Sequence, residues 1–135
     1  MGLFGGLDIS ASGMTAERLR MDVIAENLAN ADTTRGADGQ PYRRKEVVLE
    51  QRGGSFADTL QGVQSSGIVE DSSPLKRVYD PGHPDADAQG YVSLPNVEPV
   101  VEMVDLITAS RGYEANVQAM TASKQMFTRT LDILR

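Results

Sequence analysis

The only histidine of the chain, His83, stands among acids in the segment Asp-Pro-Gly-His-Pro-Asp-Ala-Asp at residues 80–87. An imidazole together with the carboxylates of Asp80, Asp85 or Asp87 offers ligand types that bind divalent metals. The alternative is a rigid turn held by two prolines, in which the Asp side chains accept hydrogen bonds from nearby backbone N–H groups. We favour the turn and predict no metal site.

The same segment resembles the start of a calcium-binding loop. Residues 85–90, Asp-Ala-Asp-Ala-Gln-Gly, put acids at loop positions 1 and 3 and a glycine at position 6. The bidentate glutamate that such a loop needs at position 12 is Asn96 here, and no flanking helix enters the loop. The match covers half of the pattern, so we predict no cofactor.

Nucleophilic catalysis needs a hydroxyl or thiol beside an oriented base. The chain has no cysteine, and a serine could pair only with His83. It contains no G-x-S-x-G elbow, no Walker loop and no G-x-G-x-x-G motif. These absences favour a protein that is not an enzyme.

The composition predicts a small acidic domain with aliphatic packing. The chain has 135 residues, a net charge of −6, three Phe, four Tyr and no Trp. A basic face is needed to bind nucleic acid, and the one basic run, residues 43–45, is followed by Glu46 and Glu50. We interpret that run as a solvated strand edge and expect no nucleic-acid partner. No stretch approaches the roughly 18 apolar residues of a membrane span, and no secretory signal peptide is recognised.

Apolar residues at helical spacing mark both ends of the chain. Near the N-terminus, steps of four and three link Leu7, Ala11, Met14, Met21, Ala25 and Leu28, with Arg18 as the one break. Near the C-terminus, Asn96 offers a cap and Pro99 suits a first turn. The following heptad seam consists of Met103, Leu106, Ser110, Tyr113, Val117, Met120, Lys124, Phe127, Leu131 and Leu134.

We therefore predict a mainly α fold, with long N- and C-terminal helices packed as an antiparallel coiled-coil pair. Further apolar residues lie off the two seams: Leu19, Val23, Ile24, Val104, Ile107 and Ala109. They either close a small bundle or meet other protein chains. The second interpretation is favoured, because a chain this short leaves much of this surface uncovered.

The middle of the chain is rich in Gly, Pro, Ser and Asp. We expect an irregular segment with short β-strands at residues 42–49, 68–69, 75–79 and 91–94, separated by turns. No structure is assigned to residues 56–63. The organisation is then an N-terminal axial helix at 1–35, a central segment at 36–95 and a C-terminal axial helix at 96–135, all within one structural unit.

Four motifs carry a family resemblance. Residues 7–14 (LDISASGM) with 20–34 (RMDVIAENLANADTT) resemble the N-terminal signature of bacterial flagellar rod and hook proteins. Residues 94–97 (LPNV), 102–111 (EMVDLITASR) and 113–117 (YEANV) resemble their closing signature. Residues 40–44 (QPYRR) and 79–92 (YDPGHPDADAQGYV) are similar to proximal-rod members. Mainly residues 53–73 stay without a recognisable pattern.

The resemblance implies a structural subunit of the proximal rod that assembles through its terminal helices into a helical tube and transmits motor torque to the hook. Its partners would be copies of itself, other rod proteins and the membrane-embedded ring and export-gate base of the rod. It implies type III export without a cleaved signal peptide and a place in the periplasm. Free subunits of this class keep their termini poorly ordered. A self-contained helical adaptor is the alternative.

Under this interpretation the helix stripes form subunit interfaces. The residues expected there are Leu7, Met14, Met21, Asn27, Leu28, Asn30, Met103, Leu106, Tyr113, Asn116, Val117, Met120, Phe127 and Leu131. Asn27 and Asn30 are polar residues close to the N-terminal stripe. They either cap the helix and contact solvent, at least for Asn30, or make interchain hydrogen bonds that fix the register.

Overall fold

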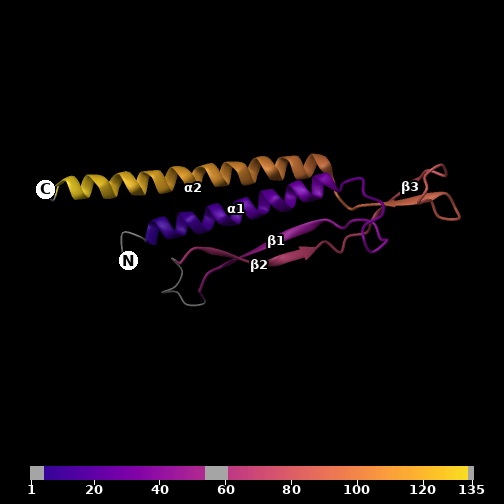
Figure 1. The fold of residues 1–135 in the computed structure, drawn as a ribbon, viewed down its shortest axis with the longest axis horizontal. Helices are drawn as coiled ribbons and strands as arrows, with labels where there is room; N and C mark the ends of the chain where they lie inside the picture. The colour runs from indigo at the N-terminus through magenta and orange to yellow at the C-terminus, as the bar shows by residue number, and fades with distance from the viewer. Residues whose placement is uncertain (1–4, 54–60, 134–135) are drawn as a thin grey trace.

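Two long helices form the body of the chain, and two β-hairpins join them. The computed structural model describes residues 5–53 and 61–133. The elements are α1 (Gly5–Ala29), β1 (Lys45–Gln51), β2 (Val63–Glu70), β3 (Lys76–Tyr79), β4 (Tyr91–Leu94) and α2 (Pro99–Ile133). The helices lie side by side and run in opposite directions (Figure 1). The predicted pair of long terminal helices with short strands between them is confirmed.

The ends of the helices follow from local chemistry. α1 ends just before Asn30, whose backbone N–H donates to the carbonyls of Glu26 and Asn27. The Asn30 side-chain amide also donates to the Glu26 carbonyl. α2 begins at Pro99, where a missing N–H leaves no unmet hydrogen bond. Asn96 does not cap this helix, because its side-chain oxygen accepts the backbone N–H of Arg44. Neither helix in the described ranges is long and apolar enough to cross a membrane.

The first hairpin packs along α1. Strands β1 and β2 pair antiparallel, and the register shifts between Val48 and Leu49, which leaves Ser66 as an extra residue on β2. Lys45, Val47 and Leu49 are half-buried, while the residues between them are exposed. This alternation is typical of a two-stranded sheet with one face covered. The hairpin contacts α1 and not α2 among the described elements.

The second hairpin lies at the far end of the molecule, beyond the start of α2 (Figure 1). Strands β3 and β4 pair from Lys76 with Leu94 to Tyr79 with Tyr91. The Tyr79 and Tyr91 rings meet edge to face with centroids 5.3 Å apart. The predicted strand at residues 91–94 matches β4, and the one at 42–49 begins three residues later than expected. Residues 56–60 of the unassigned segment, and Leu134 of the predicted seam, lie outside the described residues.

Candidate assembly site

The helix pair keeps one register along its length. A Cβ atom at Gly13 would lie 2.8 Å from the Asn116 amide oxygen, and one at Gly112 would lie 3.1 Å from Glu17. At one end of the pair Gly6 faces Ser123, and at the other Asn27 bonds to Glu102. Each step along α1 is matched by an equal step backward along α2. The glycines therefore let the two backbones approach closely.

The face of α2 that meets α1 differs from the predicted seam at every second position. Small or polar residues repeat every seven positions at Glu102, Ala109, Asn116 and Ser123. They alternate with the large residues Leu106, Tyr113, Met120 and Phe127, which are all half-buried as the seam predicts. The predicted Met103 and Val117 are instead exposed by 54% and 39%. The strict three-four alternation of the predicted seam runs through the neighbour of each of these residues, whereas the contact with α1 falls one position earlier.

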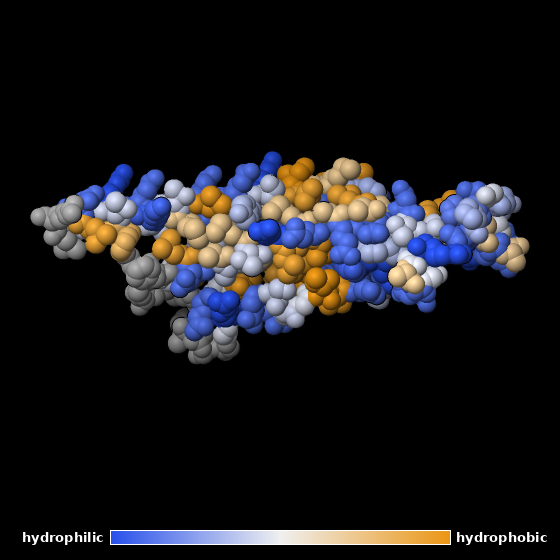
Figure 2. Space-filling view, in the orientation of Figure 1, coloured by the Kyte–Doolittle hydropathy of each residue, from blue (hydrophilic) through white to orange (hydrophobic). Residues whose placement is uncertain are grey.

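A row of apolar side chains stays uncovered on the opposite face of α2. Val100, Met103, Val104 and Ile107 are exposed, and their spacing puts them on one face of the first turns. We call these four residues the outer patch. Figure 2 shows apolar residues gathered over the N-terminal part of α2 at the upper edge. Large apolar patches on a protein surface mark contact sites.

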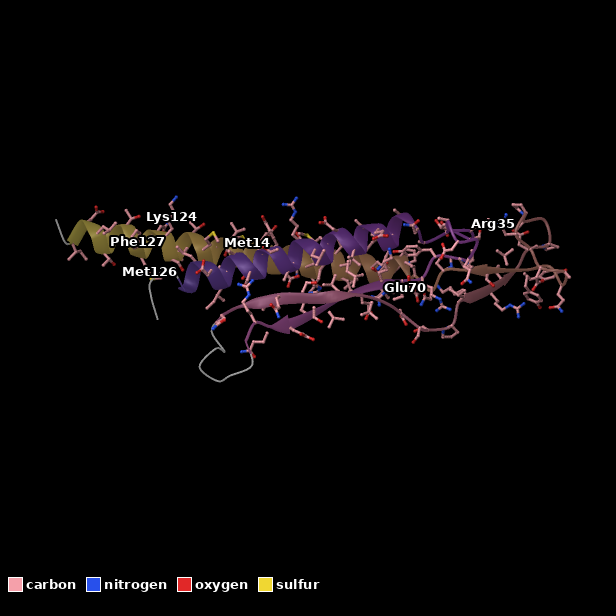
Figure 3. The ribbon with its side chains drawn as sticks, turned by 60° about the horizontal axis from the view of Figure 1, so that its bottom comes forward. Met14, Arg35, Glu70, Lys124, Met126 and Phe127 are labelled. Carbon is pink, nitrogen blue, oxygen red and sulfur yellow. The ribbon has the colours of Figure 1, made fainter. Side chains whose placement is uncertain are left out.

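The C-terminal end of α2 extends past the first turn of α1. Gly6 faces Ser123, so the last turns of α2 lie beyond the described start of α1. Figure 3 shows Lys124, Met126 and Phe127 on this overhang. Met126, Leu131 and Ile133 are exposed there. Both ends of α2 therefore present apolar surface that the described chain does not cover.

α1 carries less exposed apolar surface, because it lies between α2 and the first hairpin. Leu7, Met14, Met21 and Leu28, which we predicted at an interface, are half-buried. Val23 and Ile24 are more deeply buried than these four. The off-seam apolar residues therefore differ in burial, and Leu19 is half-buried. Val23, Ile24 and Ala109 are covered within the chain, whereas Val104 and Ile107 are not.

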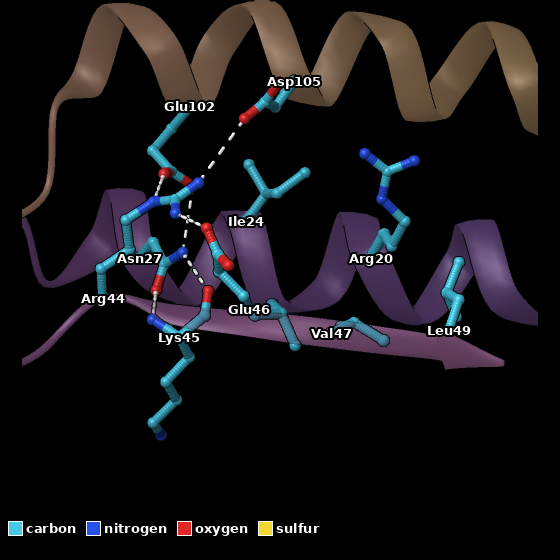
Figure 4. Close-up of a pocket in the computed structure, with 11 residues that line it drawn as sticks. Arg20, Ile24, Asn27, Arg44, Lys45, Glu46, Val47, Leu49, Glu102 and Asp105 are labelled. Carbon is cyan, nitrogen blue, oxygen red and sulfur yellow. Dashed lines mark hydrogen bonds and ion pairs between the residues drawn. The ribbon is translucent and has the colours of Figure 1, made fainter. Parts of the chain in front are cut away.

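A buried polar cluster ties the helix pair to the hairpin (Figure 4). Glu102 is fully buried, and its carboxylate oxygen Oε1 accepts a hydrogen bond from Arg44 Nε at 2.5 Å. Arg44 also pairs with Glu46 and lies 3.6 Å from Asp105. The prediction of a solvated edge at residues 43–45 is wrong for Arg44, whose side chain is only 19% exposed. The contact with the Arg44 guanidinium offsets part of the cost of burying the Glu102 side chain.

Asn27 uses its whole hydrogen-bonding capacity inside the chain. Its amide nitrogen donates to the Lys45 carbonyl at 2.9 Å and to Glu102 at 3.0 Å. Its oxygen accepts the Tyr42 hydroxyl and the Lys45 N–H, both at 2.9 Å. Burial, followed by the charges of Glu26, Glu102 and Glu70, raises the pKa of Tyr42 to about 12. An amide makes at most four such bonds, so none is left for another chain.

The other two asparagines assigned to an interface make local bonds. Asn30 donates to the Glu26 carbonyl and accepts the Thr33 hydroxyl. Asn116 donates to the Gly112 carbonyl of its own helix. Periodicity identified Asn27 as a residue near the stripe. Its partners could not be found in this way, because they come from segments far apart in the sequence.

The segment around His83 is a set of interlocked turns. His83 Nδ1 accepts the backbone N–H of Asp85 at 3.1 Å, and Asp85 accepts the Thr34 hydroxyl and pairs with Arg35. Asp87 accepts the N–H groups of Tyr91 and Gln89, and these bonds, with Arg77 nearby, hold its pKa below the usual value. In residues 5–53 and 61–133, no three His, Cys, Asp or Glu side chains are placed to hold a metal.

Comparison with known proteins identifies the class to which this architecture belongs. The family described as "Flagella basal body rod protein" matches residues 7–37, and "Flagellar basal body rod FlgEFG protein C-terminal" matches residues 88–133. These segments contain most of α1 and all of α2. The chain is therefore of the flagellar rod class.

Full-length relatives narrow the assignment. The flagellar basal-body rod protein FlgC of Bacillus subtilis is 49% identical over 98% of this chain and 99% of that protein. FlgC of Borreliella burgdorferi is 47% identical over 100% and 99%, and FlgC of Escherichia coli O6:H1 is 47% identical over 98% of each. The chain belongs to the FlgC family of flagellar basal-body rod proteins. It is a structural subunit of the rod, and its family is not one of enzymes.

Proposed function

We propose that this subunit builds the proximal rod through the surfaces of its terminal helices, which pack as an antiparallel coiled-coil pair in the inner layer of a helical tube. The outer patch is the observation that carries this proposal. The chain also exposes 9305 Å², against about 6,900 Å² for a compact globule of its mass. An elongated chain with apolar surface at both ends of one helix is suited to burying that surface between subunits.

The interface that we propose includes the residues expected from the sequence: Leu7, Met14, Met21, Asn27, Leu28, Asn30, Met103, Leu106, Tyr113, Asn116, Val117, Met120, Phe127 and Leu131. Among these, the exposed Met103, Val117 and Leu131 have the largest area left to bury. Asn27 takes part as a buried support of the helix pair. Its four bonds within the chain favour that role over an interchain hydrogen bond.

Torque transmission to the hook follows from helix packing. Side chains along a seam interdigitate, so a sliding motion must break contacts along the whole helix. Gly13 and Gly112 bring the backbones close and thereby deepen this interlock. Many such pairs packed in parallel in a tube resist twisting.

The location and partners that we propose come from the family. The rod subunit lies in the periplasmic part of the basal body and is exported without a cleaved signal peptide. It contacts copies of itself, other rod proteins and the membrane-embedded ring and export-gate base. Residues 1–35, 36–95 and 96–135 act in it as one structural unit. The rod-protein names of its relatives support this assignment.

A charge placed in the outer patch tests the proposal. In cells lacking the native gene, the variant Val104→Glu/Ile107→Glu is expected to abolish swimming and rod assembly, since two carboxylates prevent burial of the patch. Gln118→Glu is the matched control, because Gln118 is exposed on the same face beyond the patch. The helicity of each purified variant is measured alongside. Normal basal bodies in the double variant would contradict the proposal that the outer patch is buried between subunits.

A further inference from the structure

The second hairpin has no other strand and no helix to lie against. Strands β3 and β4 contact each other, and within residues 5–53 and 61–133 neither strand approaches α1, α2, β1 or β2. All four residues of β3 are exposed. A two-stranded hairpin is only marginally stable by itself in water. Contacts made by loops must therefore hold this hairpin in one direction.

The base of the second hairpin is joined to the first hairpin through Asn96. The Asn96 side-chain oxygen accepts the Arg44 N–H at 2.8 Å, and its amide nitrogen donates to the Asp71 carbonyl at 3.2 Å. The Asp71 N–H in turn donates to the Arg44 carbonyl at 2.8 Å. These bonds lie near the points where the chain enters and leaves the second hairpin. They hold one end of it and leave the turn at residues 80–90 to be fixed by other contacts.

Asp85 is the acid of this turn whose carboxylate reaches a distant segment. Asp80 and Asp87 accept backbone N–H groups of the same hairpin, which keeps the turn in shape. Asp85 instead accepts the Thr34 hydroxyl at 2.8 Å and lies 2.5 Å from the Arg35 guanidinium. We call the contacts of Asp85 with Thr34 and Arg35 the latch. The latch joins residues that are about fifty positions apart in the sequence.

The loop on the other side of the latch is tied to the end of α1. The Thr33 hydroxyl donates to the Asn30 side-chain oxygen at 3.2 Å, and the Thr33 carbonyl accepts the Tyr42 N–H at 3.1 Å. Figure 3 shows Arg35 at the end of the molecule where the second hairpin lies. A continuous series of contacts therefore extends from the end of α1, through this loop, to the turn of the second hairpin.

The latch depends on two contacts that act on one carboxylate. The Asp85 side chain is only 20% exposed, whereas that of Arg35 is 65% exposed. An ion pair with so exposed an arginine contributes little alone. The Thr34 hydroxyl binds the second carboxylate oxygen, and the Asp85 N–H donates to His83 Nδ1 at 3.1 Å. The carboxylate is thus held from both sides, which sets its orientation.

We infer that Asp85 is a positioning residue. By binding Thr34 and Arg35 it joins the turn of the second hairpin to the loop that follows α1, and so fixes the direction in which the hairpin projects. This gives a role to the segment at residues 79–92, which the rod interface proposed above does not use. The latch lies within one chain and does not require the helices to be paired before assembly.

Labelling of a single cysteine by a maleimide in purified basal bodies can show whether the latch is closed, since the chain has no cysteine of its own. Ser93→Cys puts the thiol in a hollow between the loop and the hairpin, which is lined by Thr34, Arg35, Pro41, Asp85, Tyr91 and Ser93. Ser93 is half-buried, whereas Gln89 is exposed. Gln89→Cys therefore reports how well the reagent reaches the turn in the rod.

Asp85→Ala is expected to raise the labelling rate of Ser93→Cys about threefold or more, the effect of one lost hydrogen bond on an opening equilibrium. The rate of Gln89→Cys should stay unchanged. Thr34→Val with Arg35→Gln removes the same contacts from the loop side and should give a similar rise. Adding Asp85→Ala to this pair should then change little, because all three residues act through one contact. Asp38→Ala, at an exposed acid of the same loop, is the matched control.

An unchanged rate for Ser93→Cys in Asp85→Ala rods would overturn the inference. A rise in Asp85→Ala without one in Thr34→Val/Arg35→Gln would also overturn it, because Asp85 would then only support its own turn. Asp85→Asn takes the place of the alanine variant if that variant does not enter rods. It removes the ion pair and keeps an oxygen for Thr34, so a smaller rise is expected and no rise would count against the latch.

These rates are measured inside assembled rods. A failure of the latch is therefore distinct from a failure of the proposed assembly function, which is measured by the number of rods that form in the outer-patch variant.

Discussion

The guanidinium of Arg44 lies 2.5 Å from the carboxylate of Glu102, a residue with no exposed surface. Removing one partner of such a pair leaves an uncompensated buried charge, which costs about 3–5 kcal/mol. We therefore expect Arg44→Ala to lower the free energy of unfolding by that amount in urea titrations. Arg43→Ala is the control, because within the described residues the Arg43 guanidinium donates long bonds, of 3.3 and 3.4 Å, to the Asp71 and Ser73 carbonyls. Equal losses in the two variants would contradict the assignment of Arg44 as the buried partner.

Gly62 occupies a position that a side chain cannot enter. Its φ is +93°, and a Cβ there would clash with the Ser12 hydroxyl, which accepts the Val63 N–H. Gly62→Ala is expected to lower the free energy of unfolding by about 1–3 kcal/mol from backbone strain alone. Gly67→Ala has open space around its Cβ and should change stability little. Thermal unfolding followed by circular dichroism compares the two, and a neutral Gly62→Ala would show that the hairpin does not dock as described.

Alkaline pH should weaken the cluster through Tyr42. The folded-state pKa of Tyr42 is about 12, against 10.0 for the free side chain. The neutral phenol is thus favoured by folding, and its contribution to stability is complete below pH 10 and is lost as the pH rises toward 12. We expect the unfolding free energy to fall less steeply over this range in Tyr42→Phe than in the unchanged chain. Tyr79→Phe, at an exposed ring outside the cluster, is the control for the loss of a tyrosine hydroxyl.

Ala109 tests which residues form the seam of α2. It is fully buried against α1, so Ala109→Leu forces extra volume into a close contact. Overpacking of this kind costs about 1–3 kcal/mol. Ala119→Leu lies on an exposed part of the same helix and should be tolerated. The melting temperatures of the two variants are compared with that of the unchanged chain. An Ala109→Leu chain that melts at the unchanged temperature would indicate that the seam of α2 lies at the predicted positions instead.

Periodicity predicted the two helices well, because each apolar stripe extends over many turns. A single polar residue within the stripe, such as Arg18, therefore does not hide the helical spacing. It also found Leu106, Tyr113, Met120 and Phe127, whose large side chains are half-buried. It placed the seam one residue away from Glu102 and Ala109, because the three-four alternation of the predicted seam runs through their neighbours Met103 and Ser110. In helices that pack closely, the small or paired residue occupies the contact.

The cluster itself could be predicted only in part. Asn27 drew attention as a polar residue beside an apolar stripe, but its partner Glu102 is far along the chain. Arg44 looked solvated, because neighbouring glutamates in the sequence balance its charge. Its true environment depends on the tertiary approach of α1, β1 and α2. Three of the strands were easier to place, since β-branched residues and turn signals act locally, whereas only residues 68–69 of β2 were predicted.

The first hairpin is attached to the helix pair at both of its ends. Lys45 meets Asn27 and Arg44 meets Glu102 at its base, and the Val63 N–H meets the Ser12 hydroxyl at the other end. Between these attachments the hairpin extends alongside α1 (Figure 1). When the helix pair rotates about its long axis, the two attachments therefore carry the hairpin through the same angle.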